Sequence, residues 1–126
     1  MNSPLVKSLK TVKSMAGSAS TLAEIKRHRK QADLASRLAT PKGNVDRRGF
    51  CVGKIRCEEF KPNRSYDPDY VILYCHGGGY ISGGLDYSGN LAVKLAMATG
   101  FRVYAFAYRL APEHPYPAAA EDGNAL

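Results

Sequence analysis

Two stretches near the start of the chain carry apolar residues at helical spacing. In residues 5–16 the apolar positions recur every three or four residues, with lysines on the other face, which predicts a short amphipathic helix. Thr21 followed by Glu24 has the spacing of a capping box, so a second helix is predicted from there to about Ala39. Its apolar stripe comprises Leu22, Ile25, Ala32, Ala35 and Ala39. With a turn predicted at 41–44, residues 1–44 are expected to form one basic helical segment.

Strand patterns replace the helical spacing after residue 44. Residues 49–60 alternate loosely between apolar and polar side chains, which predicts one or two edge strands. After a polar loop, residues 70–75 (YVILYC) are apolar on both faces, as is typical of a strand in the middle of a parallel sheet. Residues 101–108 (FRVYAFAY) have the same character. The two apolar segments therefore predict neighbouring strands of a parallel sheet.

A helix is predicted between the two apolar strands. Asp86 is the expected N-cap, and Gly100 fits the residue just past the helix end. The apolar positions are Leu91, Leu95 and Ala98. Strand, loop, helix and strand within about forty residues make a βαβ unit. The fold class is therefore predicted to be α/β.

Composition agrees with an ordinary globular chain. Of its 126 residues, 44% are hydrophobic and 23% are charged, which is close to common globular usage. No stretch approaches the roughly 18 uninterrupted apolar residues of a membrane-spanning helix, and the N-terminus lacks the apolar core of a secretion signal. We therefore expect a soluble chain without a transmembrane segment.

The three cysteines, Cys51, Cys57 and Cys75, form no C-x-x-C pair and have no metal-ligand spacing. Cys51 and Cys57 fall in one segment predicted to be extended, which would place them about 20 Å apart and beyond disulfide distance. All three side chains are predicted to be small buried hydrophobes. Such cysteines suit a reducing compartment, so a cytoplasmic location is expected.

The net charge of +7 is concentrated in the first half of the chain. Residues 1–66 hold 15 basic and 5 acidic side chains, whereas residues 67–126 hold 3 and 6. Such asymmetry indicates either a partner with phosphates, whether nucleic acid or an anionic membrane surface, or a solvated helix face. The dense positive patch at residues 26–30 lacks the interleaved aromatic residues that stack on bases. A nucleic-acid partner is therefore not expected.

A run of glycines follows the first apolar strand directly. The sequence HGGGY at 76–80 falls beyond the carboxyl end of a strand, where open α/β sheets bind ligands. The segment lacks the lysine of a Walker phosphate loop and the third glycine of a dinucleotide fingerprint, whose position falls on Ser82. Glycine N–H groups can instead stabilise the oxyanion of a tetrahedral intermediate. The alternative is that the glycines only make a tight turn.

Two motifs together resemble one known family. HGGGY at 76–80 and YRLAPEHPYPAAAEDG at 108–123 are similar to motifs of the hormone-sensitive-lipase-like group of α/β-hydrolases. The resemblance implies an α/β-hydrolase sheet, with residues 45–126 as the N-terminal part of the hydrolase domain and residues 1–44 as cap-type helices. It also implies a carboxylic ester substrate of short or medium acyl chain, and neither a cofactor nor a metal.

The resemblance assigns the glycine loop to the oxyanion hole. In such enzymes this loop supplies the N–H groups that bind the oxyanion, and Gly77 and Gly78 match those positions. Gly79 either widens the turn or donates as well, and Tyr80 is expected to shape the acyl pocket. The family places its catalytic histidine downstream, so His76 is interpreted as structural. Its ring either holds the glycine loop by hydrogen bonds or is a buried histidine with satisfied partners.

The other histidines and the downstream carboxylates are not expected to be catalytic. His28 lies in the basic helix and His114 in a proline-flanked turn. Glu113, Glu121 and Asp122 lie near a turn and a predicted helix start, where carboxylates stabilise exposed N–H groups.

The sequence contains no recognisable nucleophile. None of its nine serines lies in a Gly-x-Ser-x-Gly elbow, so the chain is expected to be truncated before the nucleophile, with the catalytic acid and base missing as well. The leading interpretation is the N-terminal segment of a serine carboxylesterase. The alternatives are a catalytically inactive truncated product and a basic adapter that binds an anionic surface. Without the family's next strand, residues 70–75 should expose an apolar sheet edge, which predicts that the isolated chain aggregates.

Overall fold

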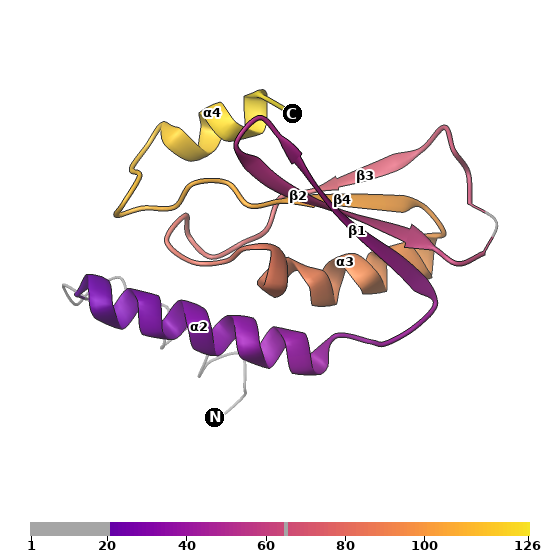
Figure 1. The fold of residues 1–126 in the computed structure, drawn as a ribbon, viewed down its shortest axis with the longest axis horizontal. Helices are drawn as coiled ribbons and strands as arrows, with labels where there is room; N and C mark the ends of the chain where they lie inside the picture. The colour runs from indigo at the N-terminus through magenta and orange to yellow at the C-terminus, as the bar shows by residue number, and fades with distance from the viewer. Residues whose placement is uncertain (1–20, 65) are drawn as a thin grey trace, which may run out of the picture.

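The computed structural model describes residues 21–64 and 66–126 (Figure 1). Within them, three helices and four strands follow one another along the chain. Their order is α2 (Leu22–Ala39), β1 (Val45–Val52), β2 (Ile55–Pro62), β3 (Val71–Tyr74), α3 (Leu85–Thr99), β4 (Arg102–Phe106) and α4 (Ala118–Asn124). The helix predicted over residues 5–16 lies outside the described residues.

The four strands form one mixed sheet in the order β1-β2-β4-β3. β1 and β2 are an antiparallel hairpin, β2 pairs antiparallel with β4, and β4 pairs parallel with β3. Because α3 connects the two parallel strands, the predicted βαβ unit and the α/β class are confirmed. In Figure 1, α3 and then α2 lie on one side of the sheet, and α4 lies on the other.

The main core lies between the sheet and α3. Phe60 of β2 and Val103 of β4 are cross-strand partners, and both are completely buried. Ala92, Val93 and Ala96 of α3 pack over them. The small side chains on this face let the helix lie close to the strands, where burial of apolar surface contributes about 25 cal/mol per Å².

The ends of α3 agree with the prediction at one end only. The helix begins at Leu85 with Gly84 as its N-cap, so the prediction that Asp86 caps the helix is wrong. Asp86 lies in the first turn, where its carboxylate faces the positive end of the helix dipole. Gly100 ends the helix as predicted, with a φ of 74° and its N–H donating to Ala96 O at 3.0 Å.

The buried face of α3 differs from the predicted one. Of the predicted apolar positions, Leu91 is 45% exposed, Ala98 is exposed and Leu95 is only partly buried. The buried residues are Ser88, Gly89, Ala92, Val93 and Ala96. The helix thus turns its small residues to the sheet, and Leu91 lines a groove between α3 and α2.

The hairpin corrects the interpretation of residues 49–60. Both strands form, but the first begins earlier than predicted, and only β1 is an edge strand because β2 lies between β1 and β4. The turn at Gly53, with a φ of 56°, folds the segment back, so the estimate of about 20 Å between Cys51 and Cys57 is wrong. Cys57 is buried as predicted, whereas Cys51 and Cys75 are exposed, and all three thiols are free.

β3 lies at an edge of the sheet that the described residues form, not in its middle. Val71 and Leu73 are each 53% exposed, while the alternate residues Ile72 and Tyr74 pack against the core. The exposed apolar edge predicted for this strand is therefore confirmed. An apolar strand with unpaired backbone groups is a template for pairing, and aggregation of the isolated chain stays a prediction.

α2 begins with the predicted capping box. The Glu24 N–H donates to Thr21 Oγ1 at 3.3 Å, and the Thr21 N–H donates to Glu24 Oε2 at 2.8 Å. The helix lies alongside α3, where Ser36 Oγ donates to Tyr87 O at 2.9 Å. No residue of α2 is fully buried, although Ile25 and Ala32 are half-buried, so the described residues cover the predicted apolar stripe only in part. None of the helices in this part of the chain has the length and apolar character needed to cross a bilayer.

Candidate functional site

The glycine loop follows the carboxyl end of β3, as predicted. Gly78 O accepts hydrogen bonds from Ile81 N–H at 3.2 Å and from Ser82 N–H at 3.1 Å, which closes a tight turn. Gly78 has a φ of 127°, which side-chain-bearing residues rarely adopt. A Cβ at this position would also lie 2.2 Å from Ser82 O. Both the backbone conformation and the available space therefore require a glycine here.

The N–H groups of Gly77, Gly78 and Gly79 are available to a ligand. All three residues are exposed, and their N–H groups donate to no acceptor within residues 21–64 and 66–126. Consecutive free N–H groups of a turn make a binding site for an anionic oxygen. Such a set can stabilise the oxyanion of a tetrahedral intermediate, which makes this loop the candidate site.

His76 is buried beside the loop, with 3% of its surface exposed. Its Nδ1 lies 2.9 Å from Gly77 O, and its ring stacks on Tyr108 with centroids 4.1 Å apart. Burial lowers the pKa of His76, so the imidazole is neutral and Nδ1–H is assigned as the donor to Gly77 O. A Cβ at Gly83 would lie 2.1 Å from Nδ1, so the ring fits only against a glycine.

The second ring nitrogen of His76 bears on the interpretation of this residue as a buried histidine with satisfied partners. Nε2 is buried and has no hydrogen-bond partner among the described residues. A buried imidazole nitrogen without a partner costs free energy, which the stacking on Tyr108 and the Nδ1 hydrogen bond must offset. The hydrogen bond from Nδ1 to Gly77 O is the contact expected if the ring holds the glycine loop, and that role stays a prediction.

Tyr108 joins the two sequence motifs, because its hydroxyl donates to His76 O. The tyrosine is the first residue of the second motif, and the histidine is the first residue of the glycine motif. Burial raises the pKa of Tyr108 to about 12, so the folded protein keeps the phenol protonated where an unfolded tyrosine ionises near pH 10. The free energy of unfolding therefore holds the full contribution of the protonated Tyr108 phenol below pH 10, and this contribution is lost as the pH rises to about 12.

Replacing Tyr108 with phenylalanine is expected to lower the free energy of unfolding by about 1 to 2 kcal/mol at neutral pH, because His76 O loses a buried donor. The variant should also lose less stability than the wild type when the pH rises above 10. Urea unfolding of the longest natural protein that contains these residues, at neutral and at alkaline pH, measures both effects. Equal stability of the two proteins at neutral pH would show that the hydroxyl makes no net contribution.

A cavity of about 370 Å³ opens beside the loop. Its wall comprises residues 75–80, the rings of Phe106 and Tyr108, and residues of α4 that include Ala119 and Ala120. The volume falls within the range of roughly 300 to 1,000 Å³ that is common for small-molecule sites. Tyr80 is 66% exposed and lies at this cavity with a φ of 61°. It is therefore placed where a residue that shapes a substrate pocket would lie.

Arg29 and Glu113 make a contact that the sequence did not predict. Arg29 Nη1 and Nη2 bind the two carboxylate oxygens of Glu113 at 2.8 and 3.0 Å. The same guanidinium donates from Nε to Ile81 O at 2.7 Å and from Nη2 to Ala111 O at 2.8 Å. The carboxylate of Glu113 was expected to stabilise N–H groups of its turn; it binds a cation of α2, and a hydrogen bond with its own backbone N–H lowers its pKa as well. One charge of the basic patch thus faces the glycine loop, not solvent.

The ion pair between Arg29 and Glu113 should make the stability of the protein sensitive to acid. The Arg29 guanidinium holds the pKa of this carboxyl at about 2, well below its ordinary 4.5. Because the pKa is lowered, the contribution of the ionised Glu113 to the free energy of unfolding is complete above pH 4.5, and it is lost as the pH falls to about 2. Glu113→Gln should therefore be less stable than the wild type at neutral pH, with a difference that narrows in acid. Urea unfolding across this pH range tests the prediction, and a difference that stays constant contradicts it.

α4 is anchored to the second motif by Arg109. The Arg109 N–H donates to Asp122 Oδ2 at 2.7 Å, and its guanidinium donates to Asp122 at 2.9 Å and to Glu121 at 3.0 Å. Asp122 therefore stabilises a backbone N–H, as expected of a carboxylate here, and pairs with a cation as well. These hydrogen bonds lower the pKa of Asp122.

The two remaining histidines are exposed, His28 on α2 and His114 in the loop before α4. Neither lines the cavity beside the glycine loop. Within residues 21–64 and 66–126, no three His, Cys, Asp or Glu side chains lie close enough together to hold a metal ion.

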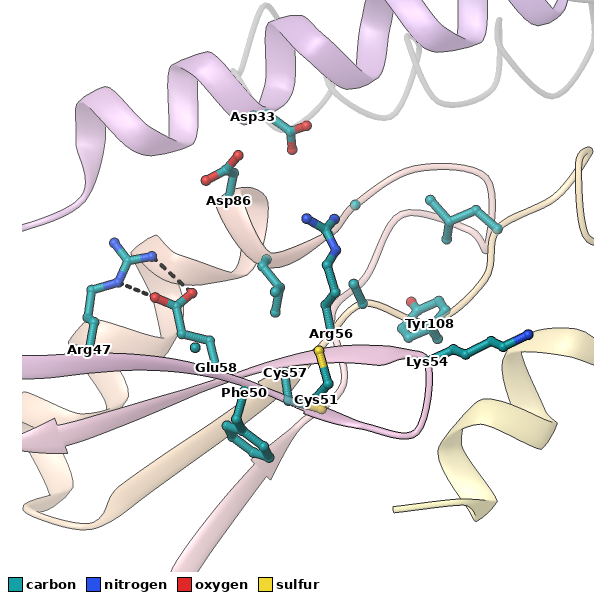
Figure 2. A pocket seen from close by; sticks show the side chains of 16 residues that line it. Asp33, Arg47, Phe50, Cys51, Lys54, Arg56, Cys57, Glu58, Asp86 and Tyr108 are labelled. Atoms are coloured by element: carbon teal, nitrogen blue, oxygen red, sulfur yellow. Dashed lines mark hydrogen bonds and ion pairs between the residues drawn. The ribbon is translucent and has the colours of Figure 1, made fainter.

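A larger cavity of about 760 Å³ lies between the β1–β2 hairpin, α2 and the start of α3, and the sequence did not predict it (Figure 2). Figure 2 shows Asp33 and Asp86 on the helical side, with Arg56 reaching toward them from the hairpin. Burial, and then the neighbouring Asp86, raise the pKa of Asp33. Arg47 is paired with Glu58 at 2.7 Å. The three glycine N–H groups lie outside this cavity, so it is distinct from the candidate site.

Comparison with known proteins identifies the fold. Residues 72–126 match a family model described as alpha/beta hydrolase fold. The crystal structure of an esterase from the bacterial hormone-sensitive lipase family superposes with a TM-score of 0.74 at 27% sequence identity, over 99% of this chain and 41% of that chain. The chain has the α/β-hydrolase fold, in the form that hormone-sensitive-lipase-like esterases show. Its four-stranded sheet is part of that fold, as the resemblance implied.

Relatives of this hydrolase segment are named as ester hydrolases. Esterase LipI of Mycobacterium tuberculosis (strain ATCC 25618 / H37Rv) is 50% identical over 52 residues, which are 41% of this chain and 16% of that protein. Acetyl-hydrolase of Streptomyces hygroscopicus is 38% identical over 88 residues, 70% of this chain and 27% of that protein. The hyperthermophilic esterase from the archaeon Pyrobaculum calidifontis has a TM-score of 0.65 at 30% identity, over 80% of this chain and 35% of that chain. The hydrolase segment spans less than half of each of these proteins.

Proposed function

We propose that the full-length gene product, meaning the longest natural protein that contains these residues, hydrolyses carboxylic esters, and that residues 77–79 form its oxyanion hole. The observation that carries this proposal is the set of three N–H groups on Gly77, Gly78 and Gly79, beyond the carboxyl end of β3, which have no acceptor in the part of the chain that the structure describes. Relatives named esterase and acetyl-hydrolase support the same reaction class.

In the proposed reaction, a serine outside these 126 residues attacks the ester carbonyl carbon, and a histidine outside them takes its proton. The carbonyl oxygen becomes the oxyanion, which accepts hydrogen bonds from the N–H groups of Gly77 and Gly78. One such donor is typically worth about 10² to 10³ in rate. Gly79 either donates as well or keeps the turn open, and Tyr80 shapes the acyl pocket. The proposed reaction uses neither a metal nor a cofactor.

The proposal also assigns the parts of the chain. Residues 1–44 belong to a cap over the substrate, and residues 45–126 form the N-terminal part of the hydrolase domain. The cavity of about 370 Å³ beside the loop supports esters of short or medium acyl chain. We further propose a cytoplasmic location, which suits the three free cysteines. We also propose no nucleic-acid partner, since residues 26–30 hold no Phe, Tyr or Trp side chain and Arg29 is paired.

Ester hydrolysis by the full-length gene product tests the proposal. The substrates are the p-nitrophenyl esters of acetate, butyrate and decanoate. We expect the highest kcat/KM for acetate or butyrate, and loss of activity after treatment with diethyl p-nitrophenyl phosphate, which modifies an activated serine. A folded full-length protein that hydrolyses none of the esters would overturn the proposal.

A further inference from the structure

Arg29 connects α2 to both sequence motifs at once. Its Nε donates to Ile81 O in the turn that follows the glycines, and its Nη2 donates to Ala111 O in the second motif. Nη1 and Nη2 bind Glu113, two residues farther along. We propose that Arg29 is a positioning residue, which holds the glycine loop in the geometry that aims its N–H groups at the substrate oxygen. The effect on catalysis rests on the proposed function, whereas the effect on loop order does not.

The glycine loop needs contacts from outside itself. Three consecutive glycines have more backbone freedom than other residues, so fixing their N–H directions costs conformational entropy. Within the loop, the hydrogen bonds are those of Gly78 O with the N–H groups of Ile81 and Ser82, and that of His76 Nδ1 with Gly77 O. Two further carbonyls are held from outside: Tyr80 O accepts from Ala111 N–H at 2.8 Å, and Ile81 O accepts from Arg29. Arg29 therefore completes the restraint of the turn.

An arginine suits this position better than any other cation. The planar guanidinium presents its donors in a fixed fork, and here that fork reaches two carbonyls and both oxygens of one carboxylate. A lysine ammonium is a single point charge on a flexible stem, so it can neutralise Glu113 but cannot bridge all these acceptors in one geometry. The Arg29 side chain is only 16% exposed, which limits competition from water for these hydrogen bonds.

Glu113 orients Arg29 and does not touch the loop itself. The carboxylate binds Nη1 and Nη2, which leaves Nε directed at Ile81 O. Glu113→Gln leaves the hydrogen bonds of Arg29 to both carbonyls in place. This substitution should therefore loosen the loop less than Arg29→Met does. This order of effects distinguishes a positioning role for the arginine from a general contribution of the ion pair to stability.

The experiment measures loop order and catalysis in the full-length gene product. Amide hydrogen exchange of residues 77–84, followed at the hydrogen-bonded N–H groups of Ile81 and Ser82, reports local opening of the loop. We expect exchange of this segment to be about 10-fold faster in Arg29→Met than in the wild type, with an intermediate rate in Arg29→Lys and a smaller change in Glu113→Gln. With p-nitrophenyl butyrate, kcat should fall about 10-fold in Arg29→Met while KM changes less than about 2-fold, since the loop acts on the transition state.

Arg102→Met is the matched control. Arg102 also binds a carbonyl, Pro68 O at 3.2 Å, and also pairs with a glutamate, Glu59 at 3.6 Å. It begins β4, and because β3 and β4 run parallel, it lies at the end of the sheet opposite the glycine loop. This variant should lose stability without faster exchange in residues 77–84 and without a change in kcat.

Hydrogen exchange and ester hydrolysis test the positioning role and the proposed function separately. Faster exchange confined to residues 77–84 in Arg29→Met supports the positioning role, even if the wild-type protein hydrolyses no ester, which would overturn only the proposed function. Unchanged exchange of this segment overturns the positioning role. So does an unchanged kcat in an active protein, or faster exchange spread equally over β2 and β4, because either result reduces Arg29 to a general stabilising residue.

Discussion

Replacing Gly78 with alanine is expected to lower kcat/KM for p-nitrophenyl butyrate by about 10² to 10³ in the full-length gene product. The added Cβ would lie 2.2 Å from Ser82 O, and the φ of 127° is one that alanine rarely adopts. The peptide must therefore rotate, which turns the N–H groups of the loop away from the oxyanion. Steady-state kinetics measure the change, and most of it should appear in kcat because the oxyanion exists only in the reaction path.

Gly77→Ala is the matched control for this prediction. Its Cβ would meet no atom within 4 Å, its φ is not positive, and the N–H group is retained. The loss in kcat/KM should therefore be at least about 10-fold smaller than for Gly78→Ala. Equal losses in the two variants would contradict the steric argument, and full activity of Gly78→Ala would contradict the assignment of this loop to the oxyanion hole.

Replacing Phe60 with alanine is expected to lower the free energy of unfolding by about 3 to 5 kcal/mol, because a completely buried ring is removed from between the sheet and α3. The ring packs with Val103 and with Val93 of the helix, and the Arg47 guanidinium lies 5.1 Å from its centroid. This loss is a large part of the roughly 5 to 15 kcal/mol that stabilises a typical domain. Urea unfolding of the full-length gene product measures it.

Leu38→Ala is the control for the core substitution. Leu38 lies on α2 and is 79% exposed, so removing the same kind of apolar side chain should change the free energy of unfolding by no more than about 0.5 kcal/mol. Phe60→Leu should fall between the two variants, since leucine refills part of the cavity. A Phe60→Ala protein within about 1 kcal/mol of the wild type would show that this cluster is not the core of the domain.

The elements that could be predicted are those whose signal is local. The capping box at Thr21 and Glu24 and the helix end at Gly100 depend on neighbouring residues, and both appear in the structure. The face that α3 buries could not be predicted, because Leu91 is apolar yet turns toward the groove beside α2 while smaller residues contact the sheet. Which side of a helix meets the strands depends on how closely the two can approach, and that is a property of the packed pair.

One part of the candidate site could be predicted from the sequence, and another part could not. The loop at 76–80 could be located from its motif and from its place after a strand, because both are properties of a short segment. The clamp of Arg29 could not, since Ile81 is 52 residues away and Glu113 is 84 residues away along the chain. In the sequence, Arg29 is one of several cations on a solvated helix. Only the fold, which places α2 beside the two motifs, distinguishes it from Lys26 or Lys30.

A crystal structure of the full-length gene product after reaction with diethyl p-nitrophenyl phosphate tests the central claim most directly. The phosphoryl oxygen of the serine adduct occupies the position of the oxyanion. We predict that this oxygen lies about 2.7 to 3.1 Å from the backbone nitrogens of Gly77 and Gly78. An adduct whose oxygen is bound by other groups, with these N–H groups directed into solvent, would contradict the assignment of the glycine loop to the oxyanion hole.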